Sequence, residues 1–189
     1  EPLKNRPVVI GSGPAGLFCA YLLAAEGYSP LIVERGAPVR ERREDVERFW
    51  KTGVLDTASN VQFGEGGAGT FSDGKLNTLV KDPAGRNRYV LETFVRFGAP
   101  EEIMWEQKPH IGTDILISVV ESMRREIQRL GGEFSFRSMV TDILPGENCL
   151  VINNEEKIET DAAVLAIGHS ARDTFSMLYD RGFSMEPKS

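Results

Sequence analysis

The feature that most constrains this chain is a glycine-rich turn between a short apolar segment and an apolar helical one. The stretch Gly11–Gly16 reads Gly-Ser-Gly-Pro-Ala-Gly and matches the pattern G-x-G-x-x-G. The β-branched segment Pro7–Ile10 before it predicts a buried strand, and Ala15–Ala25 after it predicts a buried helix. A second apolar strand is predicted at Ser29–Val33 and is closed by Glu34. Two parallel strands joined by a helix within about thirty residues form a β-α-β unit.

Each glycine of this motif has a predicted physical task. Gly11 allows the tight turn after the strand, Gly13 lets the backbone approach a pyrophosphate, and Gly16 lets the helix pack closely on the strand. The helix N-terminus offers free N–H groups and a partial positive charge to phosphates. Glu34 lies eighteen positions after Gly16, where a ribose-binding carboxylate is expected, and its charge disfavours a 2′-phosphate. The unit is therefore predicted to hold the adenosine half of FAD or NAD, with a ligand-free glycine turn as the alternative.

Two longer helices are predicted further along the chain. Pro38–Trp50 alternates basic and acidic residues and predicts a solvated helix with a salt-bridged face. Its inward-facing residues are expected to be Val46, Phe49 and Trp50. Thr113 or Asp114 is expected to cap the next helix, which Gly131-Gly132 ends. The predicted buried face of that helix consists of Ile115, Leu116, Val119, Val120, Met123, Ile127 and Leu130.

The remaining strands complete the predicted fold. They are Glu133–Phe136, Met139–Leu144, Leu150–Asn153, Lys157–Thr160 and the fully apolar, buried Ala162–Ile167. The elements predict an α/β fold, a doubly wound Rossmann-like domain with a parallel sheet and a small antiparallel β piece. This domain is expected to occupy residues 1–189, with a loop-rich excursion at about 52–112. The start of a second, substrate-side domain is expected at about 170–189.

Composition and charge argue against several classes of protein. Of the 189 residues 41% are hydrophobic, which excludes a disordered tail. The net charge of −6 argues against nucleic acid as a partner, because a nucleic-acid binder needs a basic surface. The uncharged run Pro7–Ala25 approaches the length of a membrane span, but the glycine cluster inside it breaks such a helix. Two cysteines cannot build a disulfide framework, and they indicate a reducing, cytoplasmic location.

A second glycine-rich run favours FAD over NAD. Residues 63–75 read Phe-Gly-Glu-Gly-Gly-Ala-Gly-Thr-Phe-Ser-Asp-Gly-Lys, a loop whose exposed N–H groups can face phosphates or the polar edge of a flavin. A simple NAD dehydrogenase does not need this loop, although a mobile surface loop is the plainer interpretation. Three other stretches also resemble flavoprotein versions of the fold: Pro14-Ala15, Glu34–Gly36 and the strand with its final glycine at Thr160–Gly168.

Together these motifs resemble the bacterial FAD-dependent dehydrogenases that are often described as NAD(FAD)-utilising dehydrogenases. The resemblance is carried by Arg35–Trp50, by the second glycine loop, and by His110–Asp114, which reads His-Ile-Gly-Thr-Asp. It runs from about Pro7 to the C-terminus and implies a glutathione-reductase-like FAD domain with an inserted second domain. More distantly, the sequence resembles flavoproteins that reduce isoprenoid chains or modify tRNA. Against that family pattern, a preceding region and a later glycine-aspartate motif are missing, so the chain is expected to be a fragment.

The resemblance implies a set of cofactor-binding residues. On the pyrophosphate and ribose side these are Gly11, Gly13, Pro14, Ala15, Gly16, Glu34 and Arg35. On the flavin side they are Gly67, Gly69, Thr70, Ser72, Gly74 and Lys75. Val140 would offer its backbone to the adenine, and Gly168 would flank the cofactor. No residue is identified as catalytic from the sequence.

Several side chains keep two interpretations. His110 is either an acid near the flavin or a structural loop residue, and Lys75 either stabilises negative charge on the flavin or faces solvent. His169 is expected beside the cofactor. Arg42 or Arg43 could lie near a phosphate, but a solvated, salt-bridged face is the simpler interpretation. The two histidines are 59 positions apart and show no ligand spacing, so no metal site is predicted.

The leading hypothesis is a FAD-dependent oxidoreductase with hydride transfer at the flavin, acting on a small molecule whose identity the sequence does not give. NAD(P)H is the electron donor that the family resemblance implies. Two alternatives stay open. One is a nucleotide-binding module that holds FAD without turnover, and the other is a plain NAD-dependent dehydrogenase.

Overall fold

The computed structural model describes residues 3–72, 74–76, 82–106 and 109–187, and these form an α/β fold with two sheets. The larger sheet is parallel and has the strand order β3-β2-β1-β7. Its strands are β1 (Val8–Ile10), β2 (Leu31–Val33), β3 (Glu133–Ser135) and β7 (Ala163–Leu165). The predicted α/β class with a parallel sheet is confirmed.

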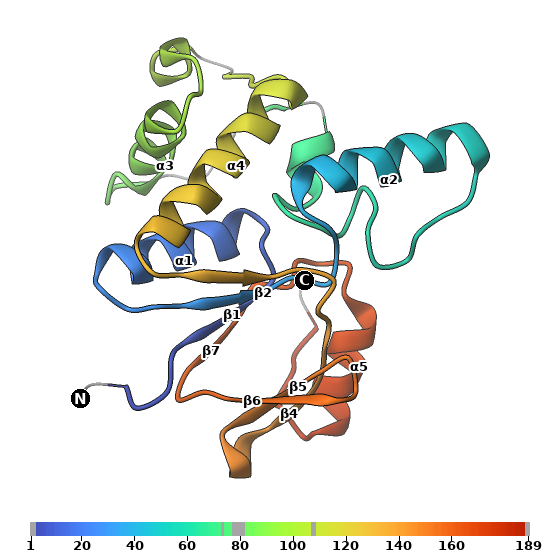
Figure 1. Cartoon of the computed structure of the whole chain (residues 1–189). Coiled ribbons are helices and arrows are strands. Elements are labelled where there is room, and N and C mark those ends of the chain that lie inside the picture. Colours follow the sequence, from blue (N-terminus) through green and yellow to red (C-terminus); the bar gives the residue numbers. More distant parts are fainter. Residues whose placement is uncertain (1–2, 73, 77–81, 107–108, 188–189) are drawn as a thin grey trace.

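Helices cover one face of the parallel sheet, and the second sheet covers the other (Figure 1). The helices on the first face are α1 (Pro14–Ala25) and α4 (Thr113–Arg129), which pack against each other. The second sheet is antiparallel, with the order β4 (Val140–Leu144), β5 (Cys149–Ile152) and β6 (Glu156–Glu159). The predicted antiparallel piece is therefore present, and it lies where a doubly wound fold usually carries further helices.

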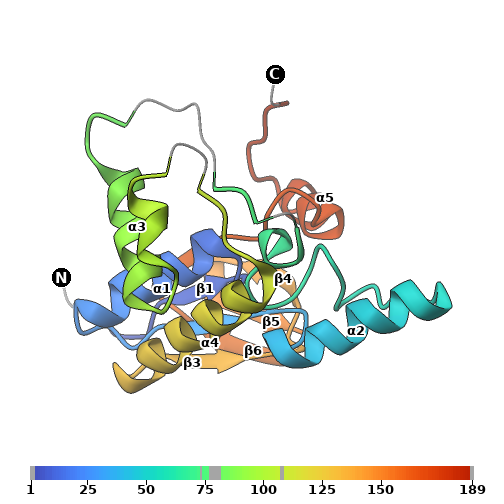
Figure 2. The same cartoon turned by 90° about the horizontal axis from the view of Figure 1, so that it is seen from above.

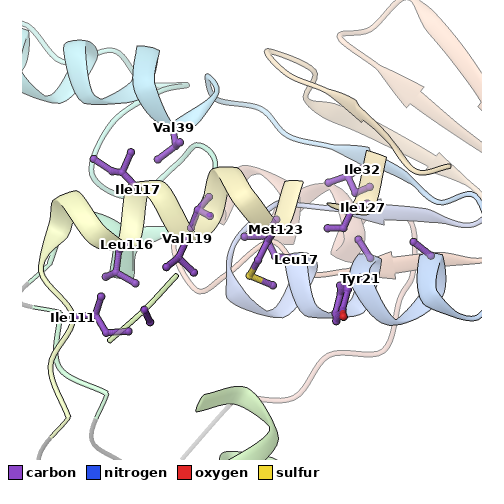
Figure 3. Packing of buried hydrophobic residues seen from close by; sticks show 14 of the residues in the cluster. Leu17, Tyr21, Ile32, Val39, Ile111, Leu116, Ile117, Val119, Met123 and Ile127 are labelled. Atoms are coloured by element: carbon purple, nitrogen blue, oxygen red, sulfur yellow. The ribbon is translucent and has the colours of Figure 1, made fainter. Parts of the chain in front are cut away.

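Successive strand residues point to opposite faces and so divide the core into two parts. On the helical side, Ile32 of β2 packs with Leu17 of α1 and with Met123 and Ile127 of α4 (Figure 3). The cluster on the other side consists of Val8, Ile10, Val33, Val140, Leu150 and Ile152. Because β1 and β2 are buried on both faces, their continuous apolar sequence was sufficient to predict them.

The prediction that the last strand is buried is wrong. β7 lies at one edge of the described parallel sheet, where it pairs with β1. Ala163 and Leu165 are exposed, and Leu165 keeps 43% of its surface accessible. An apolar sequence predicts a strand correctly here, but it does not reveal that the strand lies at an edge.

Helix α4 differs from its prediction in its cap and in one buried residue. Gly112, with extended backbone, is the N-cap, so a side-chain cap by Thr113 or Asp114 is not formed. Ile117 is buried instead of Ile115, because α2 (Val39–Thr52) packs against α4 and brings Val39 close to Ile117 (Figure 3). Because α4 packs against α2 as well as α1, its buried face is wider than contact with α1 alone would require.

Helix α2 is only in part the solvated, salt-bridged helix that its charges predict, with an exposed Arg43–Glu47 ion pair on its outer face. Arg42 and Asp45 are buried together with Val46, whereas Trp50 is exposed. The N-terminal half of α2 lies against α4, and its C-terminal end extends away from the rest of the molecule (Figure 2). Trp50 therefore lies beyond the part of the helix that has a packing partner.

The predicted excursion contains short helices as well as loops. These are the 3-10 helices η1 (Ala68–Phe71) and η2 (Glu101–Met104) and the helix α3 (Arg86–Arg96). Lys75 pairs with His110 in an isolated antiparallel bridge, which joins the second glycine loop to the His-Ile-Gly-Thr-Asp segment. Asp73 of that loop lies outside the described residues.

Two further helices complete the list: η3 (Pro145–Glu147), between β4 and β5, and α5 (Arg172–Asp180). Helix α5 lies in the region where a second domain was expected to start, and it packs against β4. Within the described ranges, no helix combines the length and the apolar character needed to cross a bilayer. The same ranges hold no cluster of three or more histidine, cysteine or acidic residues suited to a metal ion.

Candidate nucleotide-binding site

A pocket of about 670 Å³ opens where β1 and β2 end and the two glycine-rich segments meet. A volume of this size is typical of ligand and cofactor sites. Ten of the predicted cofactor-binding residues line it: Gly11, Gly13, Pro14, Ala15, Glu34, Arg35, Gly67, Gly69, Val140 and Gly168. These residues come from five separate parts of the chain, and the fold brings them to one pocket.

The first glycine motif has the steric features that its pattern predicts. A Cβ on Gly16 would lie 1.9 Å from the carbonyl oxygen of Gly11, so the close approach of helix and strand requires a glycine there. Gly11 has φ +100°, and a Cβ on it would lie 2.5 Å from the oxygen of Ala166. On Gly13 the nearest atom would be Gly67 Cα, at 3.7 Å. A side chain at Gly13 would thus make only ordinary van der Waals contact, so packing does not require a glycine at this position in the pocket lining.

Uncapped N-terminal turns of two helices point their donors at this region. Gly13 is the N-cap of α1 and Gly67 is the N-cap of η1, and neither helix has a side-chain cap. In the described part of the chain, the N–H groups of Ala15 and of Gly69 make no hydrogen bond. Free N–H groups and the dipole of α1 favour a negatively charged ligand group at this point.

Glu34 is buried beneath the glycine segments. Its Oε2 accepts hydrogen bonds from the amide and the hydroxyl of Ser12, at 2.8 and 2.9 Å. Its Oε1 accepts the amides of Gly36 and Gly64, at 2.9 and 3.1 Å. A carboxylate offers about four acceptor positions, and protein donors occupy all of them here. Because the side chain also lines the pocket, a ribose hydroxyl could reach it by replacing the Ser12 hydroxyl.

The N–H groups of the second glycine loop are less exposed than its sequence predicts. Those of Gly64, Glu65 and Gly66 donate to Glu34, to the Ala37 carbonyl and to the Ser12 carbonyl. The loop is thus tied to the first motif by its own backbone. A Cβ on Gly67 would lie 2.9 Å from Gly13 Cα, so the two segments are in close contact.

The second half of the loop lines a different and smaller pocket. Thr70, Ser72, Gly74 and Lys75 border a space of about 90 Å³, together with apolar residues of α1, α3 and α4. Pro14 and Gly69 line both pockets, so the two spaces adjoin. The residues predicted for the flavin side are therefore divided between the two.

Helix α5 forms one wall of the larger pocket. Arg35 makes two hydrogen bonds of 2.9 Å to the Asp173 carboxylate, which holds the pKa of Asp173 below its usual value. The same guanidinium donates to Thr174 and lies 4.3 Å from the centre of the Phe63 ring. Arg35 thus joins α5 to the second glycine loop.

Sequence reasoning missed several residues of this pocket. They include Gln62, Phe63, Ser170, Thr174, Phe175 and Leu178. Phe63 begins the second glycine-rich run and Gln62 directly precedes it, which was a usable signal, but α5 carries no recognisable motif. His169 lines the pocket, and it lies 3.2 Å from Ser170 Oγ, whose hydroxyl donates to Gln62.

A buried charged cluster supports the loop from behind. Glu65 is fully buried, and Val39 donates its amide to it at 2.7 Å. Arg124 Nε lies 3.2 Å from Glu65 Oε1 in an ion pair whose geometry makes no hydrogen bond. Burial raises the pKa of Glu65 to about 7 although Arg124 opposes the shift.

Arg42 is also fully buried, so the prediction of a solvated face is wrong for this residue. Arg43 is exposed and pairs with Glu47 and Asp114.

The chain matches one family model and one curated relative over most of its length. A family model described as pyridine nucleotide-disulphide oxidoreductase matches residues 5–178. An uncharacterised protein of Clostridium beijerinckii is 52% identical over 191 residues, which cover 100% of this chain and 36% of that protein. The NADPH-Fe(3+) oxidoreductase subunit beta of Geobacter sulfurreducens is 57% identical over 35 residues, 18% of this chain and 5% of that subunit. The chain thus spans well under half the length of either relative.

Solved structures agree with the fold. The THI4 protein of Thermovibrio ammonificans superposes with a TM-score of 0.56 at 18% identity, over 95% of this chain and 64% of that protein. The FAD-bound form of OTEMO superposes with a TM-score of 0.50 at 15% identity, over 89% of this chain and 26% of that one. At such identities the likeness establishes the shared fold.

Proposed function

Because the chain belongs to the pyridine nucleotide-disulphide oxidoreductase family, we propose that it provides the FAD-binding part of a flavin-dependent oxidoreductase. The observation that carries the proposal is the pocket at the uncapped N-terminus of α1, which both glycine-rich segments line. The FAD-bound form of OTEMO, which shares the fold, supports the same cofactor. The resemblance of the second glycine loop to NAD(FAD)-utilising dehydrogenases supports it as well.

The residues present fit such a cofactor. Free N–H groups at Ala15 and Gly69 suit an anionic pyrophosphate, and Gly13 leaves room for its approach. Glu34 would take the adenosine ribose once the Ser12 hydroxyl turns away. Val140, at the start of β4, would present its backbone to the adenine, with Gly168 beside the cofactor. Thr70, Ser72, Gly74 and Lys75, which border the small adjoining pocket, are the residues proposed for the flavin end.

In the proposed reaction, FAD supplies the hydride chemistry, and the protein binds and orients it. The main contribution of this chain is the rigid surface of the two glycine segments, which fixes where the cofactor lies. The apolar residues of the small pocket exclude water from the neighbouring space. We assign no side chain of the chain to proton transfer.

A nicotinamide nucleotide is the proposed electron donor. The similar Geobacter subunit is described as part of an NADPH-Fe(3+) oxidoreductase, which supports this choice. The acceptor is proposed to be a small molecule. A nucleotide-binding module without turnover is distinguished from this enzyme by one property, the reduction of its bound flavin by NADH or NADPH.

A visible absorption spectrum tests the proposal. The natural protein, at its full length, is incubated with FAD and passed through a gel-filtration column. We expect the flavin band to elute with the protein and to bleach when NADH or NADPH is added without oxygen. A colourless protein would contradict the cofactor assignment. A flavin that stays oxidised with both nucleotides would contradict the proposed donor.

A further inference from the structure

Arg42 is a buried charge that the proposed function does not use. Its side chain lies on α2 and has no exposed surface. Burying a guanidinium is costly unless its N–H groups are hydrogen bonded. The location of its acceptors therefore shows what this arginine holds in place.

Among the described residues, all the acceptors of Arg42 are backbone carbonyls of one loop, residues 60–67. Nε donates to Asn60 at 2.9 Å, and Nη2 donates to Val61 at 3.0 Å. Nη1 lies 2.6, 2.9 and 3.3 Å from the carbonyl oxygens of Glu65, Gly67 and Gly64. One guanidinium thus gathers five carbonyls of the segment that closes the pocket.

These contacts fix the opposite side of the loop as well. With its carbonyls turned toward Arg42, the loop donates the Gly64 amide to Glu34 and the Gly66 amide to the Ser12 carbonyl. Gly67 then lies against Gly13 and is the N-cap of η1. The position of the free Gly69 amide at the pocket therefore depends on the guanidinium behind the loop.

The surroundings select arginine and no other cation. Gly64 has φ +117°, and a Cβ on it would lie 2.4 Å from Arg42 Cδ, so the loop makes room for this side chain. The Phe71 ring covers the guanidinium, with 4.7 Å between Cζ and the ring centre. Burial lowers the pKa of Arg42 to about 10, which still leaves it protonated at neutral pH. A lysine has three donors on one nitrogen and cannot span carbonyls spread over eight residues, 60–67.

We propose that Arg42 is the positioning residue of the nucleotide pocket, because its guanidinium holds loop 60–67 in the form that closes on the first glycine motif. Arg42 acts through this loop and does not touch the nucleotide. The inference rests on the proposed function for its ligand, FAD. Its structural part, the control of the loop, holds for the protein without FAD and can be tested separately.

Two measurements on Arg42→Lys test the inference, with Arg43→Lys on the exposed side of α2 as the matched control. The first is hydrogen exchange of the FAD-free protein, followed in peptides that cover 60–70 and in peptides from α4. The second is the dissociation constant of FAD, from a flavin fluorescence titration. For Arg42→Lys we expect about ten-fold faster exchange confined to 60–70, and an FAD affinity weaker by about ten-fold, the equivalent of one charge-assisted hydrogen bond. The control variant is expected to match the wild type in both.

The outcomes separate the two proposals. If the wild type binds no FAD, the proposed function fails, while the exchange data still decide whether Arg42 controls the loop. If Arg42→Lys matches Arg43→Lys in exchange and in FAD affinity, the inference is overturned. If Arg42→Lys does not fold, hydrogen exchange of the Arg42 side-chain N–H groups is measured instead, by nitrogen-15 NMR of the wild type. We expect them to exchange slowly, and exchange as fast as that of Arg43 would overturn the inference.

Discussion

Ser12 and Glu34 are joined by two hydrogen bonds: the amide and the hydroxyl of Ser12 both donate to Glu34 Oε2, at 2.8 and 2.9 Å. The other carboxylate oxygen accepts the amide of Gly64 from the second glycine loop. One buried carboxylate therefore links the two segments that line the pocket, in addition to any contact that it makes with a ribose. This double task gives Glu34 an effect on stability that a residue binding ligand alone would lack.

Glu34→Gln should destabilise the protein even without a nucleotide. Each oxygen of the Glu34 carboxylate accepts two hydrogen bonds. In glutamine an NH2 group, which donates, replaces one of these oxygens, so the two donors on that side would lose their acceptor. We expect the free energy of unfolding to fall by about 2 kcal/mol, the cost of leaving buried donors unpaired. Chemical denaturation measures it. Glu44→Gln, at an exposed position of α2, is the control, and equal stability of the two variants would refute the link.

Gly13→Ala should separate binding from folding. Gly13 has φ −68°, which any residue adopts, and its new methyl group would meet no atom closer than 3.7 Å. The variant should unfold at a temperature close to that of the wild type. Gly13 lines the pocket, and the proposed pyrophosphate approaches its backbone, so with an added methyl group FAD affinity should fall by about ten-fold or more. If Gly13→Ala folds and binds FAD as tightly as the wild type, the proposed position of the pyrophosphate beside Gly13 is wrong.

Gly16→Ala should have the opposite profile. Its methyl group would lie 1.9 Å from the carbonyl oxygen of Gly11, and backbone cannot move aside as a flexible side chain can. Helix α1 would have to shift away from β1, so we expect a loss of about 3 kcal/mol or more in unfolding free energy. Gly146→Ala, where a Cβ meets nothing within 4 Å, is the control. A Gly16→Ala variant as stable as this control would contradict the close packing of α1 on β1.

The stability of the protein should depend on pH through Glu65. Its pKa in the folded protein is raised to about 7 from an ordinary 4.5, so between these values the folded state binds more protons than the unfolded state. Stability is therefore expected to fall as pH rises through this window, by up to about 3 kcal/mol at about 1.4 kcal/mol per pKa unit.

Denaturation curves at pH 5 and pH 8 measure this change. Glu65→Gln should remove most of the difference between the two pH values, whereas Glu44→Gln should keep it. The comparison uses the pH difference within each variant, so a uniform loss of stability in Glu65→Gln does not obscure the result. A Glu65→Gln variant with the same pH difference as the wild type would assign the effect to another group.

Local patterns predicted much of this structure and missed what depends on distant partners. β1, α1 and β2 were predictable because their apolar residues and the glycine turn lie within one short stretch. The burial of Arg42 was not, because its acceptors lie 18 to 25 positions further along the chain. Likewise, Ile117 is buried by α2, a contact that the periodicity of α4 alone does not contain. The pocket wall from α5 follows from tertiary packing, and its sequence carries no signal for it.

The ion pair between Arg35 and Asp173 should couple α5 to the pocket. Arg35 is mostly buried and Asp173 is about half exposed, so solvent weakens the pair, but its two parallel hydrogen bonds are favourable. A double-mutant cycle with Arg35→Met and Asp173→Asn should give a coupling energy of about 1 kcal/mol, which decreases with added salt.

The pair Arg88–Glu92, in which both side chains are at least half exposed, is the reference for this cycle, with an expected coupling of about 0.3 kcal/mol. Because Thr174 and Leu178 of α5 line the pocket, Asp173→Asn should also weaken FAD binding, whereas Glu92→Gln should not. A coupling for Arg35 and Asp173 no larger than the reference would mean that α5 is held by its apolar contacts with β4. In that case Asp173→Asn should bind FAD as the wild type does, and the ion pair would have no part in forming the pocket.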